Sequence, residues 1–202
     1  MNKKTFWDFC APVYDIFEAL NGRAYAGMLK NVQSLIPNGA TVLETAAGTG
    51  SISLAVADKA SRVLCTDISE QMLDRARRKA IKHRIQNIDF ANRSIYSLGV
   101  EDASFDIVIA GQVLHLIDEP EKAAAELRRA AKQTVILPMS FTKDLRGIAK
   151  LNVSLYRMVG FSPKREFNRE AYKHFLPSIG FEGCTYIAID GKIPMMVAVW
   201  SK

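Results

Sequence analysis

Short apolar runs alternate along the chain with segments whose apolar residues recur at helical spacing. The apolar runs predict strands at residues 41–43, 63–66, 88–90, 105–110 and 134–138. The segments between them predict helices at residues 50–59, 70–83 and 120–131. Ser69 is expected to cap the second of these helices, and Pro120 to stand in the first turn of the third. Strands separated by helices are typical of a parallel, doubly wound α/β sheet with right-handed crossovers.

The two ends of this alternating region have a different pattern. Residues 1–38 have mostly helical spacing, with one helix expected at 23–35, and we interpret them as an N-terminal helical cap. Residues 141–180 predict a helical insertion, with helices at 144–156 and 168–179. Both segments contain bulky apolar residues, Trp7 among them, which suggest a lid over an apolar substrate or ordinary packing on the sheet.

The last part of the chain returns to strands. Apolar runs at residues 184–189 and 193–200 flank Asp190-Gly191-Lys192, and an Asp-Gly pair between two such runs predicts an antiparallel hairpin. No internal repeat or linker interrupts the sequence. We therefore expect a single domain over residues 1–202.

Composition narrows the class of protein. The chain has 202 residues, of which 49% are apolar, so a globular domain with a full core is expected. No apolar stretch reaches the roughly 20 residues of a membrane span. The N-terminus has no long apolar run, so no secretory signal is expected. Cys10, Cys65 and Cys184 are scattered, which argues against a disulfide framework or a zinc site and indicates a cytoplasmic location.

The net charge of +6 has a local source. Six basic residues crowd the predicted helix at 70–83 and its end: Arg75, Arg77, Arg78, Lys79, Lys82 and Arg84. Such a cluster can bind nucleic acid or anionic lipid, or it can be the solvated face of a helix. No aromatic residues interleave to stack bases, which favours the solvated face. A nucleic-acid partner is therefore not expected, while contact with a membrane surface stays open.

The most specific chemistry lies where the first predicted strand ends. The segment Val42-Leu-Glu-Thr-Ala-Ala-Gly-Thr-Gly50 places a carboxylate, Glu44, before a turn of small residues. Asp67 ends the next strand, roughly 20 positions further on, where an acidic residue can accept from ribose hydroxyls. A dinucleotide site would need a third glycine, where this chain has Ser53, and Glu44 would repel a pyrophosphate. S-adenosylmethionine, which has an ammonium group and no phosphate, fits these residues better.

Three blocks in order make this interpretation specific. They are Val42-Leu-Glu-Thr-Ala-Ala-Gly-Thr-Gly50, Thr66-Asp-Ile-Ser-Glu-Gln-Met-Leu73 and Ser104-Phe-Asp-Ile-Val-Ile-Ala-Gly-Gln-Val-Leu-His-Leu116. Together they resemble the class I S-adenosylmethionine-dependent methyltransferases, and especially the small-molecule group that includes the ubiquinone/menaquinone C-methyltransferases. The resemblance covers over half of the chain. It implies a seven-stranded Rossmann-like sheet, the cofactor S-adenosylmethionine and the product S-adenosylhomocysteine.

The resemblance also implies roles for single residues. Glu44 would hold the methionyl amino group, and Gly48 and Gly50 would let the backbone close on the methionyl and ribose parts. Asp67 would accept from the ribose hydroxyls. The remaining implied contacts are Ile68 and Met72 with the adenine, Gln112 with the methionyl or sulfonium group, and Tyr14 closing over the cofactor.

Two positions depart from the family pattern. Ala46 replaces the usual first glycine of the turn, so the turn must accommodate a Cβ. Where the family often has Gly-Asp after the third strand, this chain has Arg93-Ser94. The Ser94 hydroxyl and the backbone of Ile95 are therefore the expected adenine contacts, with a weaker acceptor than a carboxylate.

Methyl transfer from a sulfonium depends mainly on alignment, and a general base helps with some acceptors. His115, His174, Tyr14 and Tyr25 are the candidates, and none is assigned as catalytic. We expect a small, apolar or lipid-like acceptor, such as a quinone precursor or a phospholipid amine. The alternatives are a methyltransferase acting on RNA or protein, and a non-catalytic S-adenosylmethionine-binding protein.

Overall fold

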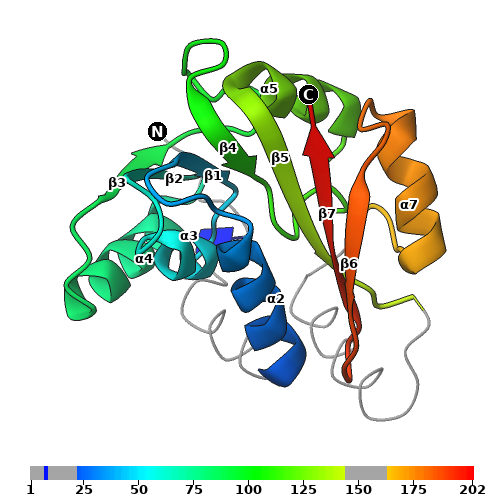
Figure 1. Cartoon of the computed structure of the whole chain (residues 1–202), viewed down its shortest axis with the longest axis horizontal. Coiled ribbons are helices and arrows are strands. Elements are labelled where there is room, and N and C mark those ends of the chain that lie inside the picture. The colour runs from blue at the N-terminus through cyan, green and yellow to red at the C-terminus, as the bar shows by residue number, and fades with distance from the viewer. Residues whose placement is uncertain (1–6, 9–21, 144–162) are drawn as a thin grey trace.

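The computed structural model describes residues 7–8, 22–143 and 163–202. Its strands are β1 (Thr41–Thr45), β2 (Arg62–Asp67), β3 (Ile88–Asn92), β4 (Phe105–Ile109), β5 (Ala131–Ser140), β6 (Thr185–Ile189) and β7 (Met195–Ser201). The helices are α2 (Gly22–Ser34), α3 (Ser51–Val56), α4 (Glu70–Lys82), α5 (Pro120–Ala130) and α7 (Arg169–Ser178). All seven strands form one sheet in the order β3-β2-β1-β4-β5-β7-β6 (Figure 1).

The sheet is parallel from β3 to β5 and antiparallel where β7 pairs with β5 and β6. This arrangement confirms the predicted fold class, including the C-terminal hairpin. Successive residues of β1 point to opposite faces, and Val42 and Leu43 are both fully buried. Each face has its own core, with α2 and α3 packed on one side and α5 and α7 on the other (Figure 1). Burial on both faces explains why the central strands are continuously apolar.

Local signals placed most helix ends correctly. Ser69 is the N-cap of α4 and its hydroxyl accepts from the backbone N–H of Met72, while Pro120 is the first residue of α5. Two elements differ from their predicted bounds by three residues at one end. Helix α3 ends at Val56, three residues earlier than predicted, and β5 extends over Ala131–Ser140 because it pairs along its length with both β4 and β7.

The structure describes the second half of the segment expected as a helical insertion at 141–180. This half forms α7, whose Tyr172 and Leu176 are fully buried in the core under the sheet. The Tyr172 hydroxyl donates to the carbonyl of Leu137 on β5 at 3.1 Å. Helix α7 therefore packs on the sheet, which is one of the two roles expected for this segment. The helix expected at 144–156 lies outside the described residues.

Helix α2 is likewise a core element, with Met28 and Val32 buried against the sheet. The rest of the predicted cap, including Tyr14, falls outside the described ranges apart from residues 7–8. None of the helices that the structure describes is long and apolar enough to cross a membrane.

Candidate cofactor-binding site

A cavity of about 330 Å³ opens at the carboxyl ends of the parallel strands. Its walls come from the segments that follow β1, β2, β3 and β4. Since β1 lies between β2 and β4, the cavity sits where the strand order reverses, which is the usual ligand site of an open α/β sheet. Of the predicted site residues, Ala46, Gly48, Asp67, Ile68 and Met72 line it. Ser94, Ile95 and Gln112 complete this set.

Asp67 is held by backbone donors. One carboxylate oxygen accepts from Gly48 N–H at 2.8 Å and the other from Ser69 N–H at 2.8 Å. The residue is only 6% exposed. Burial raises the pKa of Asp67 above its ordinary value, and the N–H groups of Ser69 and Gly48 partly offset that rise. The arrangement fixes an acceptor at the cavity wall before any ligand arrives.

The turn after β1 is forced into an unusual backbone shape. Ala46 and Gly48 have φ values of 51° and 56°, in the left-handed region that costs a residue with a Cβ roughly 1–2 kcal/mol. The Ala47 N–H donates to the carbonyl of Thr66 at 3.0 Å, which anchors the turn to β2. Ala46 thus accommodates its Cβ, as the sequence required, in a strained conformation at the cavity wall.

Two predicted residues of this turn lie behind the lining. Gly50 has a φ of 77°, and a Cβ there would come within 2.8 Å of the Ala76 Cβ on α4. Glu44 is 2% exposed, and one of its oxygens accepts from both the backbone N–H and the hydroxyl of Ser53, at 2.7 and 2.5 Å. Gly50 therefore lets α3 approach α4, and Glu44 ties β1 to the start of α3. Ser53 occupies the position where a dinucleotide site would have its third glycine, and its role as the hydrogen-bond partner of Glu44 was not predicted from the sequence.

The segment after β3 forms another wall of the cavity. The Ser94 hydroxyl accepts from Tyr96 N–H at 3.2 Å, and Ile95 is buried. Arg93 also lines the cavity, and its guanidinium donates to the carbonyls of Leu98 and Gly99 at 2.5 and 2.9 Å. Sequence reasoning assigned Arg93 no role, because nothing in a single sequence shows how this loop closes on itself.

The segment after β4 contributes Gln112, whose φ of 56° is again left-handed. Its Oε1 accepts from both the backbone N–H and the hydroxyl of Ser140, at 2.9 and 2.8 Å. Its Nε2 is buried and has no hydrogen-bond partner among the described atoms. A buried donor without a partner marks a place that a ligand can satisfy.

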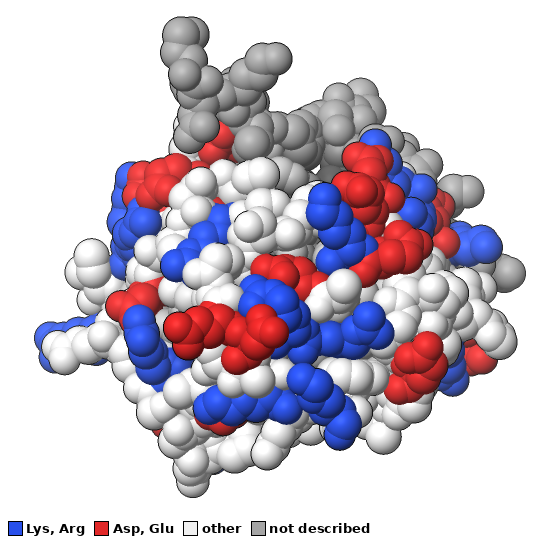
Figure 2. Space-filling view, turned by 90° about the horizontal axis from the view of Figure 1, so that it is seen from above, with Lys and Arg blue, Asp and Glu red and all other residues white. Residues whose placement is uncertain are grey.

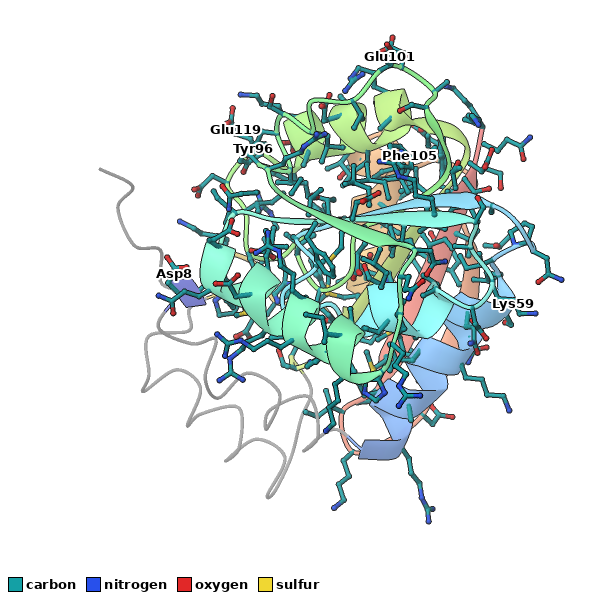
Figure 3. All side chains as sticks on the ribbon, turned by 90° about the vertical axis from the view of Figure 1, so that its left-hand side faces the viewer. Asp8, Lys59, Tyr96, Glu101, Phe105 and Glu119 are labelled. Atoms are coloured by element: carbon teal, nitrogen blue, oxygen red, sulfur yellow. The ribbon has the colours of Figure 1, made fainter. Side chains whose placement is uncertain are left out.

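The N-terminal segment also reaches the cavity. Trp7 is a lining residue, and the carboxylate of Asp8 accepts from the Ser69 hydroxyl at 2.5 Å. Figure 3 shows Asp8 beside α4. The same figure shows Tyr96 next to Glu119, and the backbone N–H of Glu119 donates to the Tyr96 hydroxyl oxygen at 3.3 Å. Trp7 was predicted only as one of several bulky apolar residues. Asp8 was not predicted, since its partner is distant in the sequence.

Comparison with known proteins agrees with this geometry. Residues 43–137 match the family model of a methyltransferase domain. The demethylmenaquinone methyltransferase of Renibacterium salmoninarum is 30% identical over 177 residues, which cover 86% of this chain and 66% of the relative. The chain belongs to the class I S-adenosylmethionine-dependent methyltransferases.

Two further proteins are similar. The phosphatidylethanolamine N-methyltransferase of Cereibacter sphaeroides is 29% identical over 122 residues, which span 59% of this chain and 60% of that protein. A solved S-adenosylmethionine-dependent methyltransferase of Thermotoga maritima, described as a possible histamine N-methyltransferase, shares the fold with a TM-score of 0.73 and 19% identity. That alignment covers 98% of each chain. The matched regions span 66% and 60% of the two curated relatives' own lengths.

The residues at the cavity fit S-adenosylmethionine, the cofactor of this family. The buried Asp67 carboxylate suits ribose hydroxyls, and the unpartnered Gln112 Nε2 suits an oxygen of a ligand. The turn is too poor in glycine to cradle a pyrophosphate, and the Glu44 carboxylate beneath it would oppose one. When bound, the cofactor supplies an electrophilic methyl group on a sulfonium.

The described candidates for a general base do not line the cavity. His115 follows Gln112 on the methyltransferase's β4 loop, and burial lowers the pKa of its imidazole to about 4, so it is neutral at pH 7. His174 on α7 is exposed, and Tyr25 packs beside the core on α2. Tyr14 lies outside the described ranges. No catalytic base is therefore assigned.

Two basic residues of α4 have polar partners, and the charge of Arg77 is balanced within the helix itself. Arg77 pairs with Glu70 at 2.6 Å and with Asp74 at 2.7 Å, and Lys79 donates to the Thr49 hydroxyl at 2.8 Å. Figure 2 shows acidic and basic side chains interspersed over the face seen from above. Mixed signs of this kind are typical of a solvated surface.

Proposed function

We propose that the protein transfers a methyl group from S-adenosylmethionine to a small, apolar or lipid-like acceptor such as a quinone precursor or a phospholipid amine. The observation that carries the proposal is the cavity at the switch point of the sheet, which is lined by both a buried carboxylate and apolar side chains. The apolar part is formed by Ile68, Met72, Val113 and Leu116, of which Ile68 is 54% exposed. An exposed isoleucine beside a cavity is suited to cover the flat face of a base.

Each site residue has a role in this proposal. Asp67 accepts from the ribose hydroxyls, and the backbone of Ala46 and Gly48 closes on the ribose and methionyl parts. Ile68 and Met72 pack the adenine, with Ser94 and the Ile95 backbone at its edge. Gln112 lies near the methionyl or sulfonium group, at the end of the cavity where the methyl group passes to its acceptor. Glu44 attracts the methionyl ammonium from beneath the turn, Gly50 permits the turn's shape, and Tyr14 belongs to the segment that covers the cofactor.

The relatives support an apolar acceptor. One is named for demethylmenaquinone and the other for phosphatidylethanolamine, and both molecules are lipids. Trp7, Leu116 and Ile117 add apolar surface to the cavity walls. Walls of this kind, with few polar groups to fix orientation, are typical of sites for apolar small molecules.

Methyl-transfer assays against three classes of acceptor test the proposal. Purified protein and labelled S-adenosylmethionine would be incubated with a reduced prenylated naphthoquinone, with phosphatidylethanolamine vesicles and with total RNA. We expect label in the lipid-soluble product of one of the first two, and none in RNA. The Asp67→Asn variant should lose this activity, while Asp89→Asn, at an exposed position on β3, should keep it. Labelling of RNA alone would overturn the proposal, and S-adenosylmethionine binding without labelling of any acceptor would favour a non-catalytic role.

A further inference from the structure

The side-chain amide of Gln112 has one orientation only. Its partner atom is the backbone nitrogen of Ser140, which carries a hydrogen and can only donate. The amide atom facing Ser140 must therefore be the oxygen, and the Ser140 hydroxyl donates to the same oxygen. Two accepted hydrogen bonds use both lone pairs of Oε1. The NH₂ group is consequently fixed on the opposite side of the amide.

That NH₂ group is the unusual feature of the cavity. Gln112 is a lining residue, and its Nε2 is buried without a partner in the described part of the chain. Leaving a buried donor unsatisfied is unfavourable, and so is the left-handed backbone of Gln112. Strain and an unsatisfied donor at one residue are the combination that functional sites retain.

The strand order places this donor away from the ribose end of the cavity. Asp67 ends β2, whereas Gln112 follows β4 and is held by Ser140 on β5. Neighbouring strands lie about 4.8 Å apart, so two to three strand spacings separate the two residues across the sheet, on the order of 10–14 Å. In S-adenosylmethionine only two carbons separate the hydroxyl-bearing part of the ribose from the sulfur. With the ribose on Asp67, a donor this far across the sheet lies beyond the sulfur, at the end of the cavity where the methionyl part and the methyl acceptor meet.

We infer that the Gln112 amide, oriented by Ser140, donates a hydrogen bond to an oxygen of the methyl acceptor. The inference rests on the proposed function and narrows its acceptor to molecules that carry a carbonyl, phenol or enol oxygen close to the methylated atom. A donor at such an oxygen stabilises the phenolate or enolate form, which is the nucleophilic one. It does little for an amine, whose single lone pair must attack the methyl group.

A pair of small probes isolates the oxygen. Alpha-tetralone and tetralin are bicyclic molecules of the same shape, and only the first has a carbonyl oxygen. The protein would be saturated with S-adenosylhomocysteine, and each probe titrated while the side-chain NH₂ signals are followed by ¹⁵N-¹H correlation spectroscopy. The Gln112 pair is identified as the one missing in Gln112→Glu. We expect tetralone to shift this pair and to bind roughly tenfold more tightly than tetralin, the effect of one satisfied donor.

Variants separate orientation from folding. Gln112→Glu should abolish the preference for tetralone, because a carboxylate has no NH₂ to donate. The matched control Gln86→Glu changes an exposed glutamine and should leave the preference intact. Ser140→Ala retains the backbone donor and loses the hydroxyl, so the preference should fall about two- to threefold and the Gln112 signals should broaden. Thermal melting and S-adenosylhomocysteine affinity verify that each variant is folded.

The outcomes are distinct. A tetralone shift that disappears in Gln112→Glu supports the inference. If S-adenosylhomocysteine alone shifts the Gln112 pair and tetralone adds nothing, the donor serves the cofactor and the inference is overturned. If S-adenosylhomocysteine does not bind, the proposed function itself fails, and the inference fails with it.

Discussion

The turn after β1 and the loop after β4 both lie at the carboxyl ends of the parallel strands, but they differ in hydrogen bonding. The polar side chains around the turn have protein partners, and one in the loop has a donor without a partner among the described residues. In the turn region, Asp67 accepts from Gly48 and Ser69, and Glu44 accepts twice from Ser53. In the loop, Gln112 is fixed through its oxygen and keeps an unsatisfied donor. The turn has its hydrogen bonds formed before a ligand arrives, whereas the loop keeps a donor for which residues 7–8, 22–143 and 163–202 supply no acceptor.

The two regions also depend on different parts of the chain. The turn is anchored within residues 43–137, the segment that matches the family model. The loop after β4 is held by residues that lie beyond position 137. The Arg165 N–H donates to the His115 carbonyl at 3.1 Å, and Lys164 pairs with Asp118 at 2.9 Å. The predicted cofactor contacts that the structure describes thus all lie within the segment that matches the family model. We propose that the choice of acceptor depends on the C-terminal segment.

The largest test of this difference is Asp67→Asn. An amide has a donor where the carboxylate accepts from Gly48 or Ser69, and it has no charge for the ribose hydroxyls. We expect S-adenosylmethionine affinity to fall by roughly 100- to 1,000-fold, consistent with losing two charge-assisted hydrogen bonds. Calorimetry measures the loss, with Asp89→Asn as the unaffected control. A loss below fivefold would show that Asp67 is not part of the cofactor site.

Gly50→Ala probes the packing behind the turn. The new Cβ would meet Ala76 at 2.8 Å in a residue with a φ of 77°, so we expect the free energy of unfolding to drop by about 3 kcal/mol. Gly39→Ala is the matched control, since its φ is 80° and nothing lies within 4 Å. It should cost only about 1 kcal/mol. If denaturant titrations give the two variants equal losses in the free energy of unfolding, the close approach of Gly50 to Ala76 does not limit the residue at position 50.

The loop after β4 should make stability depend on pH through His115. Its pKa is about 4 in the folded protein, against 6.5 in the unfolded chain, so the unfolded state binds the proton first as pH falls. The stability contributed by the neutral imidazole is full above pH 6.5 and decreases down to pH 4. Between pH 7 and pH 5 the wild type should lose about 2 kcal/mol more than His115→Gln does. His174→Gln, exposed on α7, should follow the wild type, and a His115→Gln curve parallel to wild type would contradict the account.

The smallest expected effect concerns strain in the turn. Ala46→Gly removes a Cβ at a φ of 51° and should raise the free energy of unfolding by up to about 1 kcal/mol. Ala103→Gly, at a φ of 48° away from the cavity, should give a similar gain. Only Ala46→Gly should also weaken S-adenosylmethionine binding, by a fewfold, because a glycine makes the backbone of the cavity wall more flexible. Unchanged affinity in both variants would make the Ala46 strain irrelevant to binding.

Much of the fold could be predicted from local patterns. The continuous apolar strands, the Ser69 cap and Pro120 in the first turn of α5 are each decided by short-range physics, and all were located to within a few residues. Strand β5 was predicted too short because pairing with two neighbours, and not its own sequence, sets its length. For helix α7 both a lid and packing on the sheet were expected, because a single sequence does not show which surface an amphipathic helix covers.

The site residues also separate into those that local sequence signals predicted and those that depend on tertiary contacts. Asp67 and Gly48 were found because a strand followed by a small-residue turn has a physical signature, and both line the cavity. Arg93 and Asp8 were missed because their partners, Leu98 and Ser69, are brought to them only by loop closure and tertiary folding. Glu44 was predicted as a ligand contact, and its bonds to Ser53 show a structural role that its sequence position does not reveal.

Isothermal titration calorimetry with S-adenosylmethionine tests the central claim most directly. The same protein would be titrated with S-adenosylhomocysteine and with NAD, which has the adenosine but adds a pyrophosphate. The account predicts one-to-one binding of the first two ligands, their near-complete loss in Asp67→Asn, and no measurable heat with NAD. Binding of NAD in preference to S-adenosylmethionine, or no heat with any of the three, would contradict it.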